Sequence, residues 1–156
     1  GDPTVFAVVE GCGPMIAARL IVAVQDIRRF ETKPRFKAFC GVHVLPDGRF
    51  ARRRAGEVSN WQPMARQALY LIGDQFNRRP DSAWGQKLRE YKMKLRLKHP
   101  AVELNDDHKK RYTDGHIHKM ALWRTITKFA EYLFKEWWNL EDARAAAKPQ
   151  NEQSAA

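Results

Sequence analysis

The sequence predicts a mainly α fold, and three observations support this class. Hydrophobic residues make up 44% of the 156 residues, which is enough apolar surface for a folded core. Several segments carry apolar residues at helical spacing, and clusters of turn-forming residues separate them. Only the stretch near residues 41–58 leaves room for one short β-hairpin. Because the chain is too short for two ordinary domains, we expect one helical domain over residues 1–142 and a flexible tail over residues 143–156.

The N-terminal element, over about residues 4–27, predicts two helical segments joined by a glycine turn. A short apolar segment is followed by the turn GCGP and by an apolar helix over residues 15–24, with Pro14 in its first turn. In such a helix-hairpin-helix-like element, Gly11 and Gly13 take positive φ and let the backbone approach a phosphate, while the following helix N-terminus points its N–H groups at the anion. The alternative is a purely structural turn between packed helices.

A basic region follows this element. We expect a basic loop over residues 28–37 and a short apolar segment over residues 37–44, either a helix end or a strand. The tripeptide PDG at residues 46–48 is a turn signal, and it introduces a cationic arm over about residues 45–58.

Three helices are predicted after the arm. Ser59 or Asn60 caps the first, Pro63 lies near its start, and the sequence RRP at residues 78–80 ends it. One face of this helix is apolar at the spacing of a core-facing helix: Ala65, Ala68, Leu69, Ile72 and Phe76.

The last two helices are predicted over residues 82–98 and over about residues 116–140, with a polar loop over residues 99–115 between them. The first of them is basic and amphipathic, with Trp84, Leu88, Tyr91 and Leu95 on one side. The second carries the strongest apolar stripe in the chain: Leu122, Ile126, Phe129, Leu133 and Trp137.

Charge is the first indication of a partner. The chain has 28 Lys and Arg against 18 Asp and Glu, and residues 28–98 hold 18 of these cations but only 6 of the acids. A cationic middle segment of this kind is the expected footprint of a surface that binds a polyanion such as DNA. A ribosome-associated or merely solvated basic face is the alternative.

The arm carries the densest positive charge. Arginines on a flexible segment beside a glycine turn are placed to lie along a phosphate backbone, which gives non-specific, salt-dependent binding. A solvated loop is the alternative. The arginines concerned are Arg49, Arg52, Arg53 and Arg54.

Other classes of protein fit the sequence less well. No apolar run approaches the ~20 residues of a membrane span, and the start lacks the pattern of a signal peptide. We therefore expect a cytoplasmic protein without a membrane partner. Cys12 and Cys40 have no metal-ligand spacing and are expected to be free thiols. The chain begins with Gly1 rather than Met, so we expect a piece of a longer protein.

No metal site or cofactor is expected in this chain. His116 and His118 point to different sides of a helix, so capping and packing are favoured over metal binding. The tryptophans near the end lie at helical spacing, which favours a core role over the stacking of bases; they are Trp123, Trp137 and Trp138.

At this point the motifs resemble those of a known family. The run VEGCGPMIAA at residues 9–18, followed by DIRRF at residues 26–30, is similar to a stretch of certain DEDD-type insertion-sequence transposases. These are related to the Piv DNA invertases and include the bridge-RNA-guided recombinases. Three further stretches match in order: FCGV at 39–42, GEVS with ARQALY over 56–70, and HKMA at 118–121 with Lys128. The resemblance covers roughly residues 5–140.

The resemblance implies a two-part protein. An N-terminal RuvC-like domain, absent here, carries four acidic residues that bind divalent metal, expected to be Mg²⁺. The C-terminal domain, which this chain resembles, binds DNA and supplies a serine proposed as the nucleophile. The expected partners are therefore DNA, a RuvC-like domain and, as further candidates, a guide RNA and other copies of the chain. Arg66 falls in a matching stretch and is taken as a further DNA-binding residue.

The chain also departs from the family pattern. Arg49 and Phe50 occupy the place of a Ser-Gly pair, so Ser59, at a second serine position, is the remaining candidate nucleophile. Its alternative role is the helix N-cap. Two functions therefore stay open: the DNA-binding domain of a transposase or site-specific recombinase that is inactive as an isolated fragment, and a stand-alone nucleic-acid-binding module, a diverged remnant without chemistry.

Overall fold

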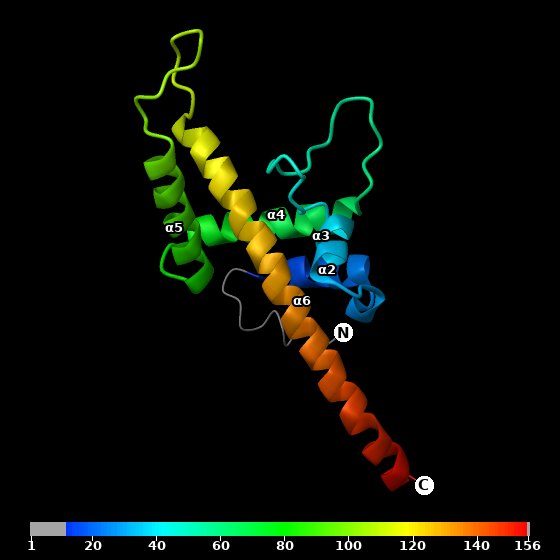
Figure 1. Ribbon diagram of the computed structural model, residues 1–156. Helices are drawn as coiled ribbons and strands as arrows, with labels where there is room; N and C mark the ends of the chain where they lie inside the picture. Colours follow the sequence, from blue (N-terminus) through cyan, green and yellow to red (C-terminus); the bar gives the residue numbers. More distant parts are fainter. Residues whose placement is uncertain (1–11, 156) are drawn as a thin grey trace.

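The computed structural model describes residues 12–155, with side chains described for residues 12–147, and it confirms the mainly α class (Figure 1). The N-terminal apolar segment of the predicted hairpin lies outside the described residues. The elements in chain order are α2 (Pro14–Val24), the 3-10 helix η1 (Ile27–Arg29), α3 (Lys33–Phe39), α4 (Pro63–Arg78), α5 (Ala83–Lys98) and α6 (Asp114–Ala155).

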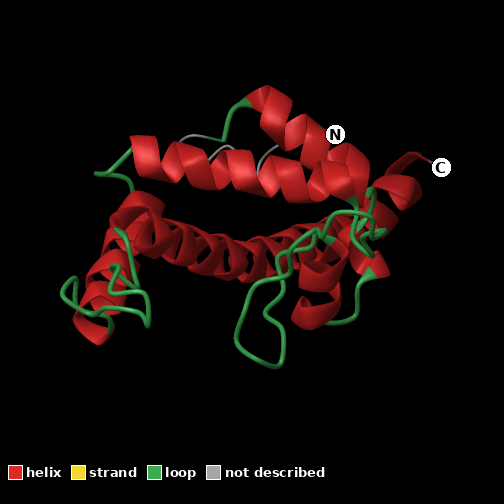
Figure 2. Ribbon diagram, turned by 90° about the horizontal axis from the view of Figure 1, so that it is seen from above, coloured by secondary structure: helices red, strands yellow, loops and turns green. Residues whose placement is uncertain are grey.

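Helix α6 is the axis around which the other elements are arranged. It packs against α3, α4, α5 and η1, while α2 packs against α4. Figure 1 shows α6 running diagonally, with α5 beside its first half and α3 and α4 near its middle. The two long loops, one between α3 and α4 and one between α5 and α6, leave the helices on the same side of the molecule in both views (Figures 1 and 2).

The core lies mainly between α4 and α6, and the apolar periodicity predicted it. All five residues of the apolar face of α4 and all five of the predicted stripe of α6 are buried. The rings of Phe76, Trp84 and Phe129 meet where α4, α5 and α6 come together, with Phe129 5.3 Å from Phe76 and 5.2 Å from Trp84 between centroids. Such aromatic pairs add to the stability that burial of their area already provides.

The tryptophans near the end of the chain belong to this core. Trp137 is buried, and Trp123 and Trp138 are partly buried against the core. The indole N–H of Trp138 donates a 3.2 Å hydrogen bond to the carbonyl oxygen of Phe30, which ties α6 to the segment after η1. These positions support packing rather than base stacking.

The region predicted as a basic loop is partly helical. Instead of a loop over residues 28–37, the structure has η1 and the start of α3. Thr32 caps α3 by accepting a hydrogen bond from the backbone N–H of Arg35, and Pro34 lies in the first turn. Phe36 is fully buried, so core packing of this side chain stabilises a helix that is too short to be stable alone.

The start of α4 differs from the prediction. Neither Ser59 nor Asn60 caps this helix; the cap is Gln62, whose Oε1 accepts hydrogen bonds from the backbone N–H groups of Met64 and Ala65 at 2.5 and 3.1 Å. Pro63, with its fixed φ and missing N–H, occupies the first turn, which places the cap directly before it.

The last helix is longer than predicted. It begins at Asp114, two residues before the expected start, and continues to Ala155 rather than ending at Leu140. The segment EDARAAA over residues 141–147 consists largely of strong helix formers, which explains the continuation. The flexible tail over residues 143–156 stays a prediction.

Candidate nucleic-acid interface

The cationic arm, residues 45–58, forms most of the loop between α3 and α4. Its first part is a tight turn closed by a single antiparallel bridge between Val44 and Phe50. Leu45 donates its N–H to the carbonyl of Arg49 at 2.7 Å, and Gly48, with φ +83°, donates to the carbonyl of Leu45 at 2.8 Å. The predicted hairpin is therefore reduced to one bridge and its turn, and the described residues contain no strand.

Aromatic contacts fix the base of the arm to the helices. The Phe50 ring stacks on that of Trp123 in α6, with 6.5 Å between centroids, and Tyr70 of α4 lies 5.8 Å from the same indole. Ala51 is buried beside them, with 5% of its surface exposed. The arm thus leaves the core from a fixed point, which reduces the entropy lost when it binds a partner.

Arg66 of α4 holds the two ends of the loop together. Its guanidinium lies between two indole rings, 4.6 Å from the centroid of Trp61 and 4.4 Å from that of Trp123. It also donates a hydrogen bond to the carbonyl oxygen of Gly41. Burial lowers the pKa of Arg66 from its ordinary value. Its contact with DNA stays a prediction, and the structure gives it a packing role that the sequence did not indicate.

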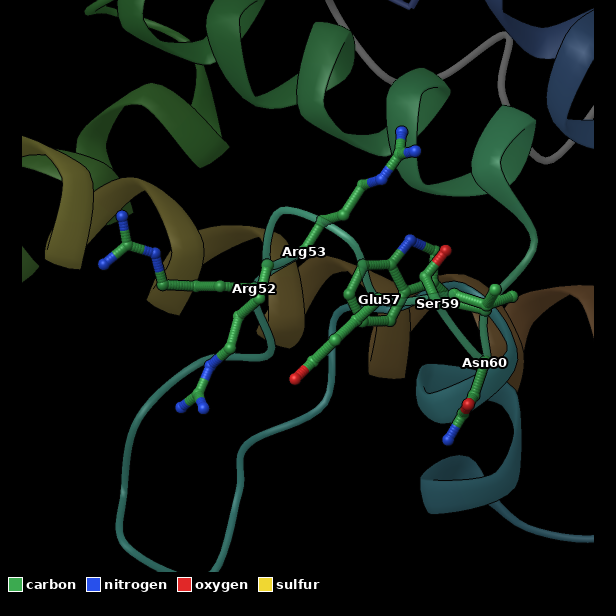
Figure 3. Close-up of a pocket in the computed structure, with 8 residues that line it drawn as sticks. Arg52, Arg53, Glu57, Ser59 and Asn60 are labelled. Carbon is green, nitrogen blue, oxygen red and sulfur yellow. The ribbon is translucent and has the colours of Figure 1, made fainter.

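Three of the predicted arginines surround a pocket of about 160 Å³ at the end of the arm (Figure 3). In Figure 3, Arg52 and Arg53 lie on one side, Ser59 and Asn60 on the other, and Glu57 between them. All three arginines are exposed, and among the described residues none of them forms an ion pair. The complete lining is Arg52, Arg53, Arg54, Glu57, Val58, Ser59, Asn60 and Trp61.

The fourth arginine is placed differently. Arg49 lies in the turn itself, where its guanidinium is 3.9 Å from the carboxylate of Asp47. Both side chains are largely exposed, so this ion pair is weak and leaves Arg49 accessible. The structure therefore brings Arg52, Arg53 and Arg54 together and leaves Arg49 apart from them.

Ser59 lies in the wall of the arginine pocket. It is half-buried, and because Gln62 caps α4, its hydroxyl is not engaged as an N-cap. The pocket lining contains one carboxylate, Glu57, and no histidine. A serine hydroxyl in a pocket lined by arginines can contact a bound phosphate, but a nucleophilic serine also needs a group that accepts its proton.

The predicted glycine hairpin is only partly described. Gly11 lies outside the described residues. Gly13 is the N-cap of α2 with φ −68° and ψ 164°, so the positive φ expected there is wrong. The physical reason is Pro14, because the residue before a proline is restricted to extended conformations. A Cβ built on Gly13 meets nothing within 4 Å, and phosphate contact at this helix start stays a prediction.

The remaining titratable residues do not form a second chemical centre in the described part of the chain. Within residues 12–147, no group of three or more His, Cys, Asp and Glu side chains is placed to hold a metal ion. Both cysteines are free; burial raises the pKa of Cys12 to about 11 and raises that of Cys40 further. Burial, followed by the charge of Lys92, lowers the pKa of His118.

Sequence reasoning missed two features of this surface. The first is His43 at the base of the arm, whose buried Nδ1 has no hydrogen-bond partner and whose pKa is lowered by burial and by the charges of Arg66 and Lys37. The second is the loop between α5 and α6, in which a single bridge joins Leu104 to Lys110. The run of turn-forming residues at 105–107 followed by KKR at 109–111 was the signal for this second hairpin.

Comparison with protein families supports the motif resemblance. The model of the transposase IS116/IS110/IS902 family matches residues 4–87, which is more than half of the chain. The chain belongs to this transposase family. The matched segment begins at residue 4, includes the glycine turn, and continues through α2, α3, the arm and α4 into α5, so the arginine pocket and Ser59 lie within it.

The other comparisons add no relatives of this transposase chain. Neither the search of curated proteins nor the search of solved structures found a match. Among the described residues, no helix combines the length and the apolar character that crossing a membrane requires.

Proposed function

We propose that this chain is the DNA-binding domain of a transposase or site-specific DNA recombinase and that its arginine pocket holds a phosphate of the DNA backbone. The observation that carries the proposal is the pocket itself: it is lined by Ser59 and by three exposed arginines that form no ion pair with the residues the structure describes. Guanidinium groups match phosphate oxygens with two parallel N–H donors each. Membership of a transposase family makes DNA the expected source of that phosphate.

The anchoring of the arm favours binding at a defined position. Phe50 stacks on Trp123, and the Arg66 guanidinium lies between Trp61 and Trp123. Both ends of the arm are therefore fixed to α4 and α6, while the arginine side chains extend into solvent. Phosphate contacts of this kind set the position and orientation of a protein on DNA without reading its sequence.

Ser59 is the candidate nucleophile in this proposal. Its hydroxyl is free of a capping role and lies in the pocket wall across from Arg52 and Arg53, whose charge would stabilise the negative charge that develops on a phosphate under attack in the pocket. Glu57 is the one group in the pocket lining that could accept the proton of the hydroxyl. The described residues offer no donor set for Mg²⁺, so we assign the divalent metal to a RuvC-like domain outside them.

One observation favours the alternative function, a nucleic-acid-binding module without chemistry. The Ser-Gly pair of the family pattern is replaced by Arg49 and Phe50, and Phe50 is used to fix the arm to Trp123. In that case Ser59 contacts phosphate but does not attack it. A guide RNA and other copies of the chain remain candidate partners in either case.

Salt-dependent binding tests the proposal. Replacing Arg52, Arg53 and Arg54 with alanine should lower the slope of log affinity against log salt for an unrelated duplex by about one, because the pocket holds one phosphate and each phosphate contact contributes ~0.9. The control is a variant with the same loss of charge at exposed positions away from the arm, Arg19→Ala, Lys33→Ala and Lys135→Ala. Equal losses in both variants, or no binding by the unaltered chain at low salt, would refute the pocket as the DNA site.

A further inference from the structure

The loop between α5 and α6 repeats the backbone construction of the arm. In the second hairpin, residues 103–112, Asn105 donates to the carbonyl of Lys109 at 2.8 Å and His108 donates to that of Asn105 at 3.0 Å. The same two hydrogen bonds close the turn of the arm at the corresponding positions, and in both loops the bridge joins residues six apart. His108 has φ +59° at the position that Gly48 occupies with φ +83° in the arm.

An arginine also ties together the two ends of the second hairpin, although it comes from the preceding helix, whereas Arg66 comes from the helix that follows the arm. Arg96 of α5 donates to the carbonyl of His99 at 3.3 Å, to that of Tyr112 at 3.0 Å and to the carboxylate of Asp114 at 2.6 Å. The rings of His99 and Tyr112 stack at 3.9 Å between centroids, so both ends of the loop are tied together. Arg66 performs the corresponding function for the arm.

Cations follow the turn in both hairpins. Lys109 and Lys110 are exposed and, among the described residues, form no ion pair, while Arg111 pairs with Glu103 at 3.0 Å. The turn itself carries Asp106 and Asp107, which repel phosphate. The side of the hairpin that can approach DNA is therefore its second half, after the turn.

We propose that the second hairpin is a second contact with the DNA backbone and that the two hairpins hold one duplex between them. Both loops leave the helices on the same side of the molecule (Figures 1 and 2). Lys109 and Lys110 neutralise phosphates at a point separate from the arginine pocket. This hairpin lies outside the segment matched by the family model, and the inference rests on the proposed function of the arm.

Two sets of variants test the proposal: one removes positive charge after the turn of the second hairpin, and the other removes negative charge from the turn itself. The double variant Lys109→Ala and Lys110→Ala should lower the salt slope for duplex binding by about two. The variant Asp106→Asn and Asp107→Asn should bind the same duplex more tightly, because it removes repulsion without adding a cation. Arg19→Ala with Lys135→Ala is the charge-matched control.

A hydroxyl-radical footprint on a duplex separates this inference from the proposed function. Loss of Lys109 and Lys110 should remove protection at one end of the footprint and leave protection by the arginine pocket intact. The pocket variant should show the reverse. If the pocket variant loses binding while both hairpin variants leave affinity, slope and footprint unchanged, the second contact is refuted and the proposed function stands. Binding of the hairpin to single-stranded RNA, but not to duplex DNA, refutes it as well.

Discussion

Gly41, which precedes the arm, has a backbone conformation and a close neighbour that both disfavour a side chain. Its φ is +67°, and a Cβ added there would lie 2.5 Å from Cγ of Trp61, so a side chain is both strained and in contact with a packed indole. We expect Gly41→Ala to destabilise the protein by more than about 2 kcal/mol. Urea unfolding gives the free energy, and DNA affinity should fall with it because Trp61 is displaced.

Two other glycines serve as controls for that substitution. Gly56 has φ +81° but open space around it, so Gly56→Ala should cost about 1 kcal/mol from backbone strain alone. Gly13 has a φ that alanine accepts and nothing within 4 Å, so Gly13→Ala should cost less than about 1 kcal/mol, the modest loss expected when alanine replaces glycine at an N-cap. A Gly41→Ala variant as stable as the Gly13→Ala variant would contradict the contact with Trp61.

Variants of Arg66 distinguish a packing role of this side chain from a direct contact with phosphate. Arg66→Lys keeps the charge but loses the planar guanidinium that lies between two indoles, and we expect a loss of about 1–2 kcal/mol in stability. If Arg66 only positions the arm, Arg66→Ala lowers DNA affinity without changing the salt slope. A slope lower by about one would instead identify Arg66 as a direct phosphate contact.

At the scale of elements, the start of α4 decides the role of Ser59. Because Gln62 provides the cap, Gln62→Ala should destabilise the protein by about 1 kcal/mol, and Ser59→Ala should leave its stability nearly unchanged. Thermal unfolding of both variants measures this directly. DNA affinity should fall for Ser59→Ala, through loss of its hydroxyl in the pocket. If Ser59→Ala were instead the more destabilising of the two variants, Ser59 would be the cap of α4.

The sequence predicted those helices whose buried apolar face repeats at regular spacing. The apolar faces of α4 and α6 were identified by periodicity, because a helix that packs on a core must repeat its apolar residues every three or four positions. Capping was not predictable in detail, since Ser59, Asn60 and Gln62 all precede Pro63 and only backbone geometry selects one. Helix α3 was anticipated only as the helix end that was one alternative for residues 37–44, and its start at Lys33 was missed because seven residues carry too little periodicity.

The candidate site was predictable in its charge but not in its assembly. The four arginines of the arm were read directly from the sequence, and three of them line the pocket. The stack of Trp61, Arg66 and Trp123 joins residues far apart in the chain, so no local pattern could reveal it. At Gly13 a local pattern was present but was interpreted wrongly. The glycines predicted a positive φ, whereas the neighbouring proline enforces an extended backbone.

At the scale of the whole molecule, the helices support two hairpins, the cationic arm and the second hairpin, whose three cations are balanced by three acids. Helix α6 contributes to the base of both loops, since it carries Trp123 beside the arm and begins directly after the second hairpin.

This arrangement predicts binding without cleavage by the isolated chain. Phosphoryl transfer needs preorganised positive charge at the reacting phosphate, commonly a divalent metal, together with a group that accepts the proton of the nucleophile. The arginine pocket supplies charge, but the described residues contain no cluster of metal ligands. Incubation of the chain with supercoiled plasmid and Mg²⁺ should thus give retarded but intact DNA on a gel. Mg²⁺-dependent nicking that disappears in Ser59→Ala would show instead that this chain carries a complete active site.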